Sequence, residues 1–124
     1  VRLPDKIRIV DDEPDIVDLV KKILEKNGYV IFSASNGDEA LEKVASEKPD
    51  LILLDVIMPG KTGLEVCKIL KAQPKTRSIP VLMFTALGRE IDKEYARQAG
   101  ADSFLGKPFT MDDLTSEVQK FLGA

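Results

Sequence analysis

The sequence predicts an α/β protein built on an open, doubly wound sheet of five parallel strands. Short apolar stretches alternate along the whole chain with longer segments in which apolar residues recur at the 3.6-residue period of a helix. Residues 51–54 are continuously apolar, which is typical of a parallel strand covered by helices on both faces. Five strand–helix units are too few for an eight-stranded barrel, so an open sheet is the expected arrangement.

The predicted elements follow one another in order from the N-terminus. The first strand covers Ile7–Val10, and the helix that begins after Asp11-Asp12 ends at Asn27-Gly28, a favourable C-terminal cap. The remaining predicted strands lie at residues 29–33, 51–54, 81–84 and 103–105, and the remaining helices at 37–47, 64–72, 91–99 and 111–122.

Two of the helix starts carry a local marker. Asn36 with Glu39, and Thr62 with Glu65, have the spacing of a capping box. These pairs set the boundaries of the second and third helices.

Composition limits the possible functions. With 124 residues and a net charge of −3, the chain is expected to form one domain over residues 1–124, without a basic arm for direct nucleic-acid binding. No apolar run approaches the roughly 20 residues of a membrane helix. A single cysteine, Cys67, excludes an internal disulfide, and nothing resembles a signal peptide, which favours the cytoplasm. Cys67 shares a helical face with Leu64 and Leu70, so a packing role is expected.

Histidine is absent from the chain. This absence removes histidine general bases, histidine zinc ligands and a phospho-accepting histidine. Any phosphoryl chemistry must therefore use carboxylates, or a histidine supplied by a partner.

Polar residues follow four of the predicted strands. Asp11 and Asp12 follow the first strand, Asp55 the third, Thr85 the fourth and Lys107 the fifth. Because ligands bind beyond the carboxyl ends of parallel strands, these residues are expected to form one site. Three neighbouring carboxylates repel one another, and a cation relieves that cost. Their hard oxygen ligands suit Mg²⁺, with Mn²⁺ as a possible substitute.

The same residues could carry out phosphoryl transfer. A carboxylate can attack phosphorus directly and form an aspartyl-phosphate, a role that we assign to Asp55. Lys107 would then pair with one phosphoryl oxygen, and the Thr85 hydroxyl would donate a hydrogen bond to another.

Each residue also has an ordinary structural interpretation. Asp11 and Asp12 could cap the first helix, because Asp is favoured at such positions. Asp55 could be a turn residue, Thr85 an ordinary residue at a strand end, and Lys107 a solvated lysine. Ordinary residues have no reason to collect at one edge of four strands, which favours the functional interpretation.

Four segments together resemble the CheY-like receiver domains of bacterial and archaeal response regulators. They are Val10–Pro14, Leu54–Gly60, Thr85-Ala86 and Lys107–Phe109. The resemblance implies a flavodoxin-like three-layer sandwich with strand order 2-1-3-4-5. It also implies a phosphoacceptor signalling domain that catalyses only its own phosphorylation and slow dephosphorylation, and is not otherwise an enzyme.

The resemblance further implies roles for individual residues. Asp55 would accept the phosphoryl group from a phosphohistidine on a sensor histidine kinase or a histidine phosphotransfer protein. Asp12 and Asp55 would bind magnesium directly, Asp11 would bind it through water, and the Ile57 backbone carbonyl would add a further ligand.

The expected switch consists of Thr85 and Phe104. Movement of these side chains would change the face formed by the fourth helix, fifth strand and fifth helix, and a downstream effector would bind to that face. The Lys107–Pro108 bond is expected to be cis. Ile57 and Leu87, two residues after Asp55 and Thr85, are apolar and cannot orient an attacking water, so slow loss of phosphate is expected.

Three other functions fit less well. Aspartate-based phosphohydrolases need a second acid where this chain has Ile57. Dinucleotide or flavin binding lacks a G-x-G-x-x-G sequence after the first strand, and the segment from Gly100 to Lys107 is only a near miss for a phosphate loop. A protein-interaction module that is never phosphorylated has no need of the complete set of site residues.

Overall fold

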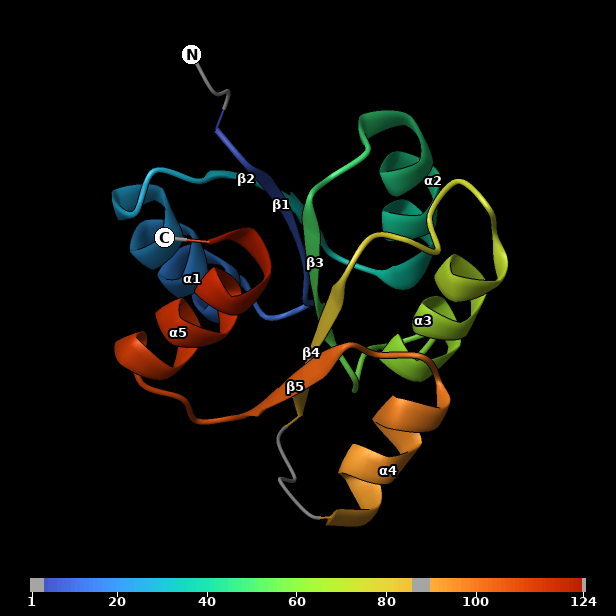
Figure 1. Ribbon diagram of the computed structural model, residues 1–124. Coiled ribbons are helices and arrows are strands. Elements are labelled where there is room, and N and C mark those ends of the chain that lie inside the picture. Colours follow the sequence, from blue (N-terminus) through green and yellow to red (C-terminus); the bar gives the residue numbers. More distant parts are fainter. Residues whose placement is uncertain (1–3, 86–89, 124) are drawn as a thin grey trace.

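The computed structural model describes residues 4–85 and 90–123, without the side chains at positions 85 and 90–92. Strands and helices alternate along the chain (Figure 1). The strands are β1 (Lys6–Val10), β2 (Val30–Ala34), β3 (Leu51–Asp55), β4 (Val81–Thr85) and β5 (Ser103–Gly106), and the helices are α1 (Pro14–Lys26), α2 (Gly37–Glu47), α3 (Gly63–Ala72), α4 (Glu90–Gln98) and α5 (Met111–Leu122).

The five strands form one parallel sheet in the order β2-β1-β3-β4-β5. This order confirms the predicted fold class, including the arrangement that the family resemblance implied. The chain reverses its direction of winding at β1, which lies between β2 and β3. In such sheets the crevice beyond the carboxyl ends of the strands at the reversal is the usual place for a ligand.

Helices cover both faces of the sheet. Helices α1 and α5 lie on one face, and α2, α3 and α4 lie on the other (Figure 1). The side chains buried on the first face form the α1/α5 core, made of Ile7, Ile9, Val20, Ile23, Leu24, Ile31, Leu51, Leu53, Leu82, Phe84, Leu114 and Val118. Those on the second face form the α2–α4 core, which includes Val10, Val44, Ile52, Leu54, Val66, Cys67, Leu70, Val81, Met83 and Ala96.

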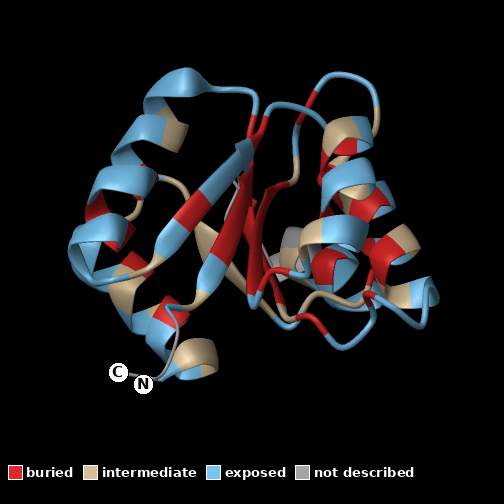
Figure 2. Ribbon diagram, turned by 90° about the horizontal axis from the view of Figure 1, so that it is seen from above, coloured by how far each residue is buried: buried red, intermediate tan, exposed pale blue. Residues whose placement is uncertain are grey.

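The two cores explain the continuously apolar third strand. Successive side chains of a strand point to opposite faces. Leu51 and Leu53 therefore enter the α1/α5 core, whereas Ile52 and Leu54 enter the α2–α4 core. Figure 2 shows the buried central strands between helices whose outer surfaces are exposed.

The helix starts differ in detail from the predicted capping boxes. Asn36 Oδ1 accepts a hydrogen bond from Glu39 N at 2.9 Å, and Thr62 Oγ1 accepts one from Glu65 N at 3.2 Å, so both N-caps form. The Glu39 carboxylate, however, accepts from Ser35 N and not from the cap residue itself. The spacing was enough to predict where the caps lie. Whether the Glu39 carboxylate also accepts from the N-cap backbone depends on the path of the preceding loop.

Cys67 has the packing role predicted for it. The side chain is fully buried in the α2–α4 core. Burial raises the pKa of its thiol to about 11, so the reactive thiolate is scarce at neutral pH.

A lysine holds the opposite edge of the sheet, at the amino ends of β4 and β5. Lys71 Nζ donates to Asp102 Oδ2 and Ile79 O, both at 2.8 Å, and to Arg77 O at 3.2 Å. Asp102 also accepts from Val81 N at 2.8 Å. These bonds fasten the end of α3 to the two strands.

Among the described helices, none combines the length and the apolar character that a membrane span requires.

Candidate functional site

The three predicted carboxylates meet at the carboxyl edge of the sheet. Asp11 and Asp12 directly follow β1, and Asp55 is the last residue of β3. Each of them has a carboxylate oxygen within 4.8 Å of one belonging to each of the others. Asp11 and Asp55 are buried, while Asp12 is exposed. The cluster is therefore open to solvent on the side of Asp12.

The direction of the Asp55 side chain follows from the alternation of side chains along β3. Asp55 continues the row of Leu51 and Leu53, which belongs to the α1/α5 core. Asp11 likewise continues the row of Ile7 and Ile9, and its N–H extends the sheet by donating to Ala34 O at 3.1 Å. The two carboxylates thus lie above the end of the α1/α5 core, which shields them from water.

Lys107 is the cation of this site. Its Nζ donates to Asp11 Oδ2 at 2.9 Å and lies 3.4 Å from Asp55 Oδ1 and 3.6 Å from Glu13 Oε1. The Lys107 side chain is 12% exposed. With Asp12 beside it, the cluster contains one positive charge and four carboxylates among the described residues, so these residues carry a negative excess.

Burial and the neighbouring charges both affect the pKa of Asp55. Burial, followed by the negative charge of Asp11, raises the pKa of Asp55 to about 6, although Lys107 opposes the change. Burial lowers the pKa of Lys107, but its hydrogen bond to Asp11 and the charges of Asp55 and Asp11 outweigh burial, and the pKa is raised. The lysine is charged, and it only partly offsets the effect of burial and of Asp11 on Asp55.

The interpretation of Asp11 and Asp12 as caps of the first helix is supported only in part, through Asp11. The N-cap of α1 is Glu13, which makes no side-chain cap hydrogen bond. Asp11 Oδ1 accepts from Glu13 N at 3.0 Å, while its Oδ2 accepts from Lys107. Asp11 therefore orders the turn before α1 and contributes to the charged cluster at the same time.

Gly63 is a positioning residue that the sequence interpretation missed. A Cβ added at Gly63 would lie 2.1 Å from the backbone oxygen of Asp55. Gly63 N donates to Val56 O at 2.9 Å, and Val56 N donates to Phe84 O at 3.0 Å. Only glycine lets the start of α3 approach the backbone of Asp55 this closely. The glycine directly after the Thr62 N-cap was the available signal.

The structure describes the remaining predicted site residues to different extents. The backbone of Thr85 pairs with Gly106 at the end of β4, but its side chain is outside the described residues, as is Leu87. The Ile57 side chain is 59% exposed in the loop after β3. The Lys107–Pro108 bond is cis, as the resemblance implied.

Phe104 is only partly buried. It packs against the α2–α4 core, and the Lys93 ammonium lies 5.1 Å from the centroid of its ring. Its role in a switch stays a prediction.

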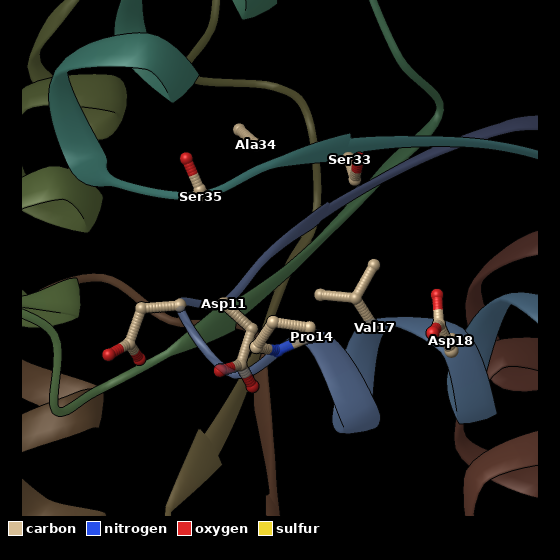
Figure 3. A pocket seen from close by; sticks show the side chains of 8 residues that line it. Asp11, Pro14, Val17, Asp18, Ser33, Ala34 and Ser35 are labelled. Carbon is tan, nitrogen blue, oxygen red and sulfur yellow. The ribbon is translucent and has the colours of Figure 1, made fainter.

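A cavity of about 200 Å³ adjoins the carboxylates on the β2 side of β1 (Figure 3). Figure 3 shows its wall between the start of α1 and the end of β2, and its lining residues are Asp11, Asp12, Pro14, Val17, Asp18, Ser33, Ala34 and Ser35. No basic side chain occurs among these lining residues, all of which are described. The cavity is therefore separate from Lys107, which contacts Asp11 and Asp55.

Comparison with known proteins identifies the class to which this fold and site belong. The family model for the response regulator receiver domain matches residues 7–119, so the chain belongs to the response regulator receiver family. It is a receiver domain of a two-component signalling system with an acidic pocket at the end of its sheet.

Particular relatives share this architecture. The chain is 45% identical over 117 residues to the alkaline phosphatase synthesis transcriptional regulatory protein PhoP of Bacillus subtilis, covering 94% of this chain and 48% of that protein. The chain thus spans about half the length of this curated relative.

Two solved structures are similar over nearly their full length. A putative response regulator from Chloroflexus aurantiacus is 34% identical with a TM-score of 0.93, covering 98% of this chain and 99% of that one. The receiver domain of the sensor histidine kinase PA1611 from Pseudomonas aeruginosa is 27% identical with a TM-score of 0.90, at the same coverage. That second structure has a magnesium ion coordinated in its active site cleft.

Proposed function

We propose that this receiver accepts a phosphoryl group onto Asp55 from a phosphohistidine of a sensor histidine kinase or a histidine phosphotransfer protein. The observation that carries the proposal is the convergence of Asp11, Asp12, Asp55 and Lys107 from three strand ends, with a single lysine beside buried carboxylates. These 124 residues contain no histidine, so the donor histidine must lie outside them.

The transfer forms one bond and breaks one bond. A carboxylate oxygen of Asp55 attacks phosphorus and forms a P–O bond, while the P–N bond of the phosphohistidine breaks and its electron pair leaves with the imidazole nitrogen. Lys107, 3.4 Å from Asp55 Oδ1, can pair with one equatorial phosphoryl oxygen. We assign the Thr85 hydroxyl to a second oxygen.

The carboxylates fit a magnesium ion, with manganese as a possible substitute. They offer only hard oxygen ligands within 4.8 Å of one another, and one lysine does not neutralise them. We propose that Asp12, Asp55 and the Ile57 carbonyl bind the ion directly and that Asp11 binds it through water. When bound, the ion neutralises negative charge on the carboxylates and the transferring phosphoryl group.

Phosphorylation is proposed to act as a switch. Thr85 is the last residue of β4, and Phe104 lies in β5, a strand that contacts both α4 and α5. A change in these side chains would alter how the face formed by α4, β5 and α5 binds a downstream effector. We propose that residues 1–124 form one receiver domain that works in the cytoplasm and does not itself contact nucleic acid, although the Bacillus subtilis relative is named as a transcriptional regulator.

We propose that the phosphorylated state is long-lived. Ile57 projects an exposed apolar side chain two residues after the acceptor and cannot orient a water for attack. Phosphate release measured after removal of the donor should take much longer than seconds, and a half-life of seconds would contradict this proposal.

Intact-mass measurement after incubation with acetyl phosphate tests the acceptor chemistry. The protein and Asp55→Asn are each incubated with and without Mg²⁺. The expected result is a gain of about 80 Da, one phosphoryl group, that requires both Mg²⁺ and Asp55. No gain under any condition would favour a protein-interaction module that works without phosphorylation.

A further inference from the structure

An aromatic pair lies beneath the site lysine. The rings of Phe84 and Phe109 are stacked, with centroids 5.2 Å apart and planes at 24°. Lys107 Nζ lies 5.9 Å from the centroid of the Phe84 ring, within the range of a cation–π contact. The ammonium therefore has carboxylates as hydrogen-bonding partners and an aromatic ring as a further neighbour.

Phe84 is tied to the acceptor through the sheet. It is the register partner of Asp55 in the parallel pair of β3 and β4, and its carbonyl accepts from Val56 N at 3.0 Å. Its side chain is fully buried in the α1/α5 core, the core that Asp55 also faces. The ring therefore has a fixed position relative to the acceptor carboxylate.

Phe109 is fixed from the other side. It directly precedes Thr110, the N-cap of α5, whose side chain and that of Asp113 form a complete capping box. Phe109 and Leu114 occupy the positions of a hydrophobic staple, and both belong to or pack against the α1/α5 core. The start of α5 thus holds the ring that stacks on Phe84.

We propose that Phe84 is a positioning residue that holds the Lys107 ammonium beside Asp55 during phosphoryl transfer, with Phe109 holding the Phe84 ring in place. This inference rests on the proposed function and concerns the route by which Lys107 reaches the phosphoryl oxygen.

The physical reason lies in the flexibility of lysine. Lys107 must turn from Asp11 toward a phosphoryl oxygen, and a long unbranched side chain has many other conformations available. The face of an aromatic ring attracts an ammonium group without occupying any hydrogen-bond donor of that ammonium. The ammonium can therefore exchange hydrogen-bond partners above Phe84 without leaving the site.

The competing explanation is that Phe84 only fills the core. A double-mutant cycle separates the two roles, because a residue that acts through Lys107 loses its effect when the lysine charge is absent. The variants are Phe84→Leu, Lys107→Met and the double variant. Met83→Leu, a buried substitution on the opposite face of the same strand, is the matched control.

The readout is the rate of Mg²⁺-dependent mass gain with acetyl phosphate, per folded molecule. Phe84→Leu should slow phosphorylation about three- to tenfold in the presence of Lys107 and less than about twofold in the Lys107→Met background. Met83→Leu should leave the rate unchanged. An equal loss in both backgrounds, or no loss in either, would overturn the proposal.

Phe109 provides a second test if Phe84→Leu folds poorly. Phe109→Leu should slow the reaction, and Phe109→Tyr, which keeps an aromatic ring at a partly buried position, should restore it. Loss of rate in both Phe109 variants would contradict the role of the stacked rings.

A measurement without phosphorylation distinguishes failure of this inference from failure of the proposed function. In NMR spectra of the unphosphorylated protein, Phe84→Leu should shift the Lys107 ε-methylene signals by removing the ring current, and Met83→Leu should not. An unchanged Lys107 signal would overturn the positioning role even if the protein is phosphorylated. A shifted signal in a protein that gains no phosphoryl group would support the contact and reject the proposed function.

Discussion

Two lysines at opposite edges of the same sheet have very different surroundings. Lys71 at the amino edge is 18% exposed and donates to one carboxylate and two backbone carbonyls. Lys107 at the carboxyl edge is 12% exposed and lies within 3.6 Å of three carboxylates. The two side chains are buried to a similar degree, so the difference lies in their partners.

The difference separates a structural cation from one suited to chemistry. The three donors of Lys71 have three neighbouring acceptors, and its one positive charge meets one negative charge. Such a group is satisfied and has little to gain from a ligand. Lys107 belongs to a cluster with excess negative charge, where a metal ion can improve the electrostatic balance. Under the proposed function, a phosphoryl oxygen replaces Asp11 as the hydrogen-bond partner of Lys107.

The largest expected effect is on phosphorylation when the lysine of the carboxyl edge is removed. Lys107→Met should lower the rate with acetyl phosphate and Mg²⁺ by about 100- to 1,000-fold, because a charge-assisted donor to the phosphoryl oxygens is lost. Intact mass over time measures the rate. Lys71→Met is the matched control, and an equal loss in both variants would contradict the distinction between the two lysines.

The second expected effect is on stability at the amino edge. Lys71→Met should lower the free energy of unfolding by about 2 kcal/mol, because Asp102 and the Ile79 carbonyl lose their hydrogen-bond donor. Urea unfolding followed by circular dichroism measures the change. A loss below about 0.5 kcal/mol would show that solvent replaces these bonds without cost.

The third prediction concerns the burial of the Asp55 carboxylate beside Asp11. Its raised pKa of about 6 means that, between the usual Asp pKa and about 6, the folded state binds more protons than the unfolded state. Stability from this group is therefore lost as pH rises through that window. Without metal, Asp55→Asn should be more stable than the parent by about 1 kcal/mol at pH 7.

The pH dependence of that difference is its own control. The advantage of Asp55→Asn should vanish below about pH 3, where Asp55 is protonated in both states. Mg²⁺ should also reduce it at pH 7, because a bound cation stabilises the carboxylate. Urea midpoints measured across this pH range, with and without Mg²⁺, provide the test; an advantage that is constant with pH would exclude a charge effect.

The smallest expected effect is at Glu13, the outermost acid near Lys107. Its side chain is 60% exposed and lies 3.6 Å from the ammonium, so water and salt screen the pair. Glu13→Gln should change the phosphorylation rate by less than about twofold. A tenfold change would mean that this exposed carboxylate helps to place Lys107, and would extend the site beyond the buried acids.

Features that depend on neighbouring residues in the chain could be predicted from the amino-acid sequence. Strand 51–54, the N-caps at Asn36 and Thr62, and the appearance of Asp11, Asp12 and Asp55 after apolar strands could all be predicted, because alternation and capping act over a few residues. Since parallel strands end at one edge, these local signals were enough to predict that the acids gather there.

The contacts within the site became known from the three-dimensional structure. It placed Lys107 closer to Asp11 than to Asp55, brought the Gly63 backbone against Asp55, and stacked Phe84 on Phe109. It also gave Lys71 one carboxylate and two carbonyl partners, whereas it surrounded Lys107 with three carboxylates. These contacts join residues far apart in sequence, and their distances follow from strand register and the packing of α3 and α5, which no local pattern specifies.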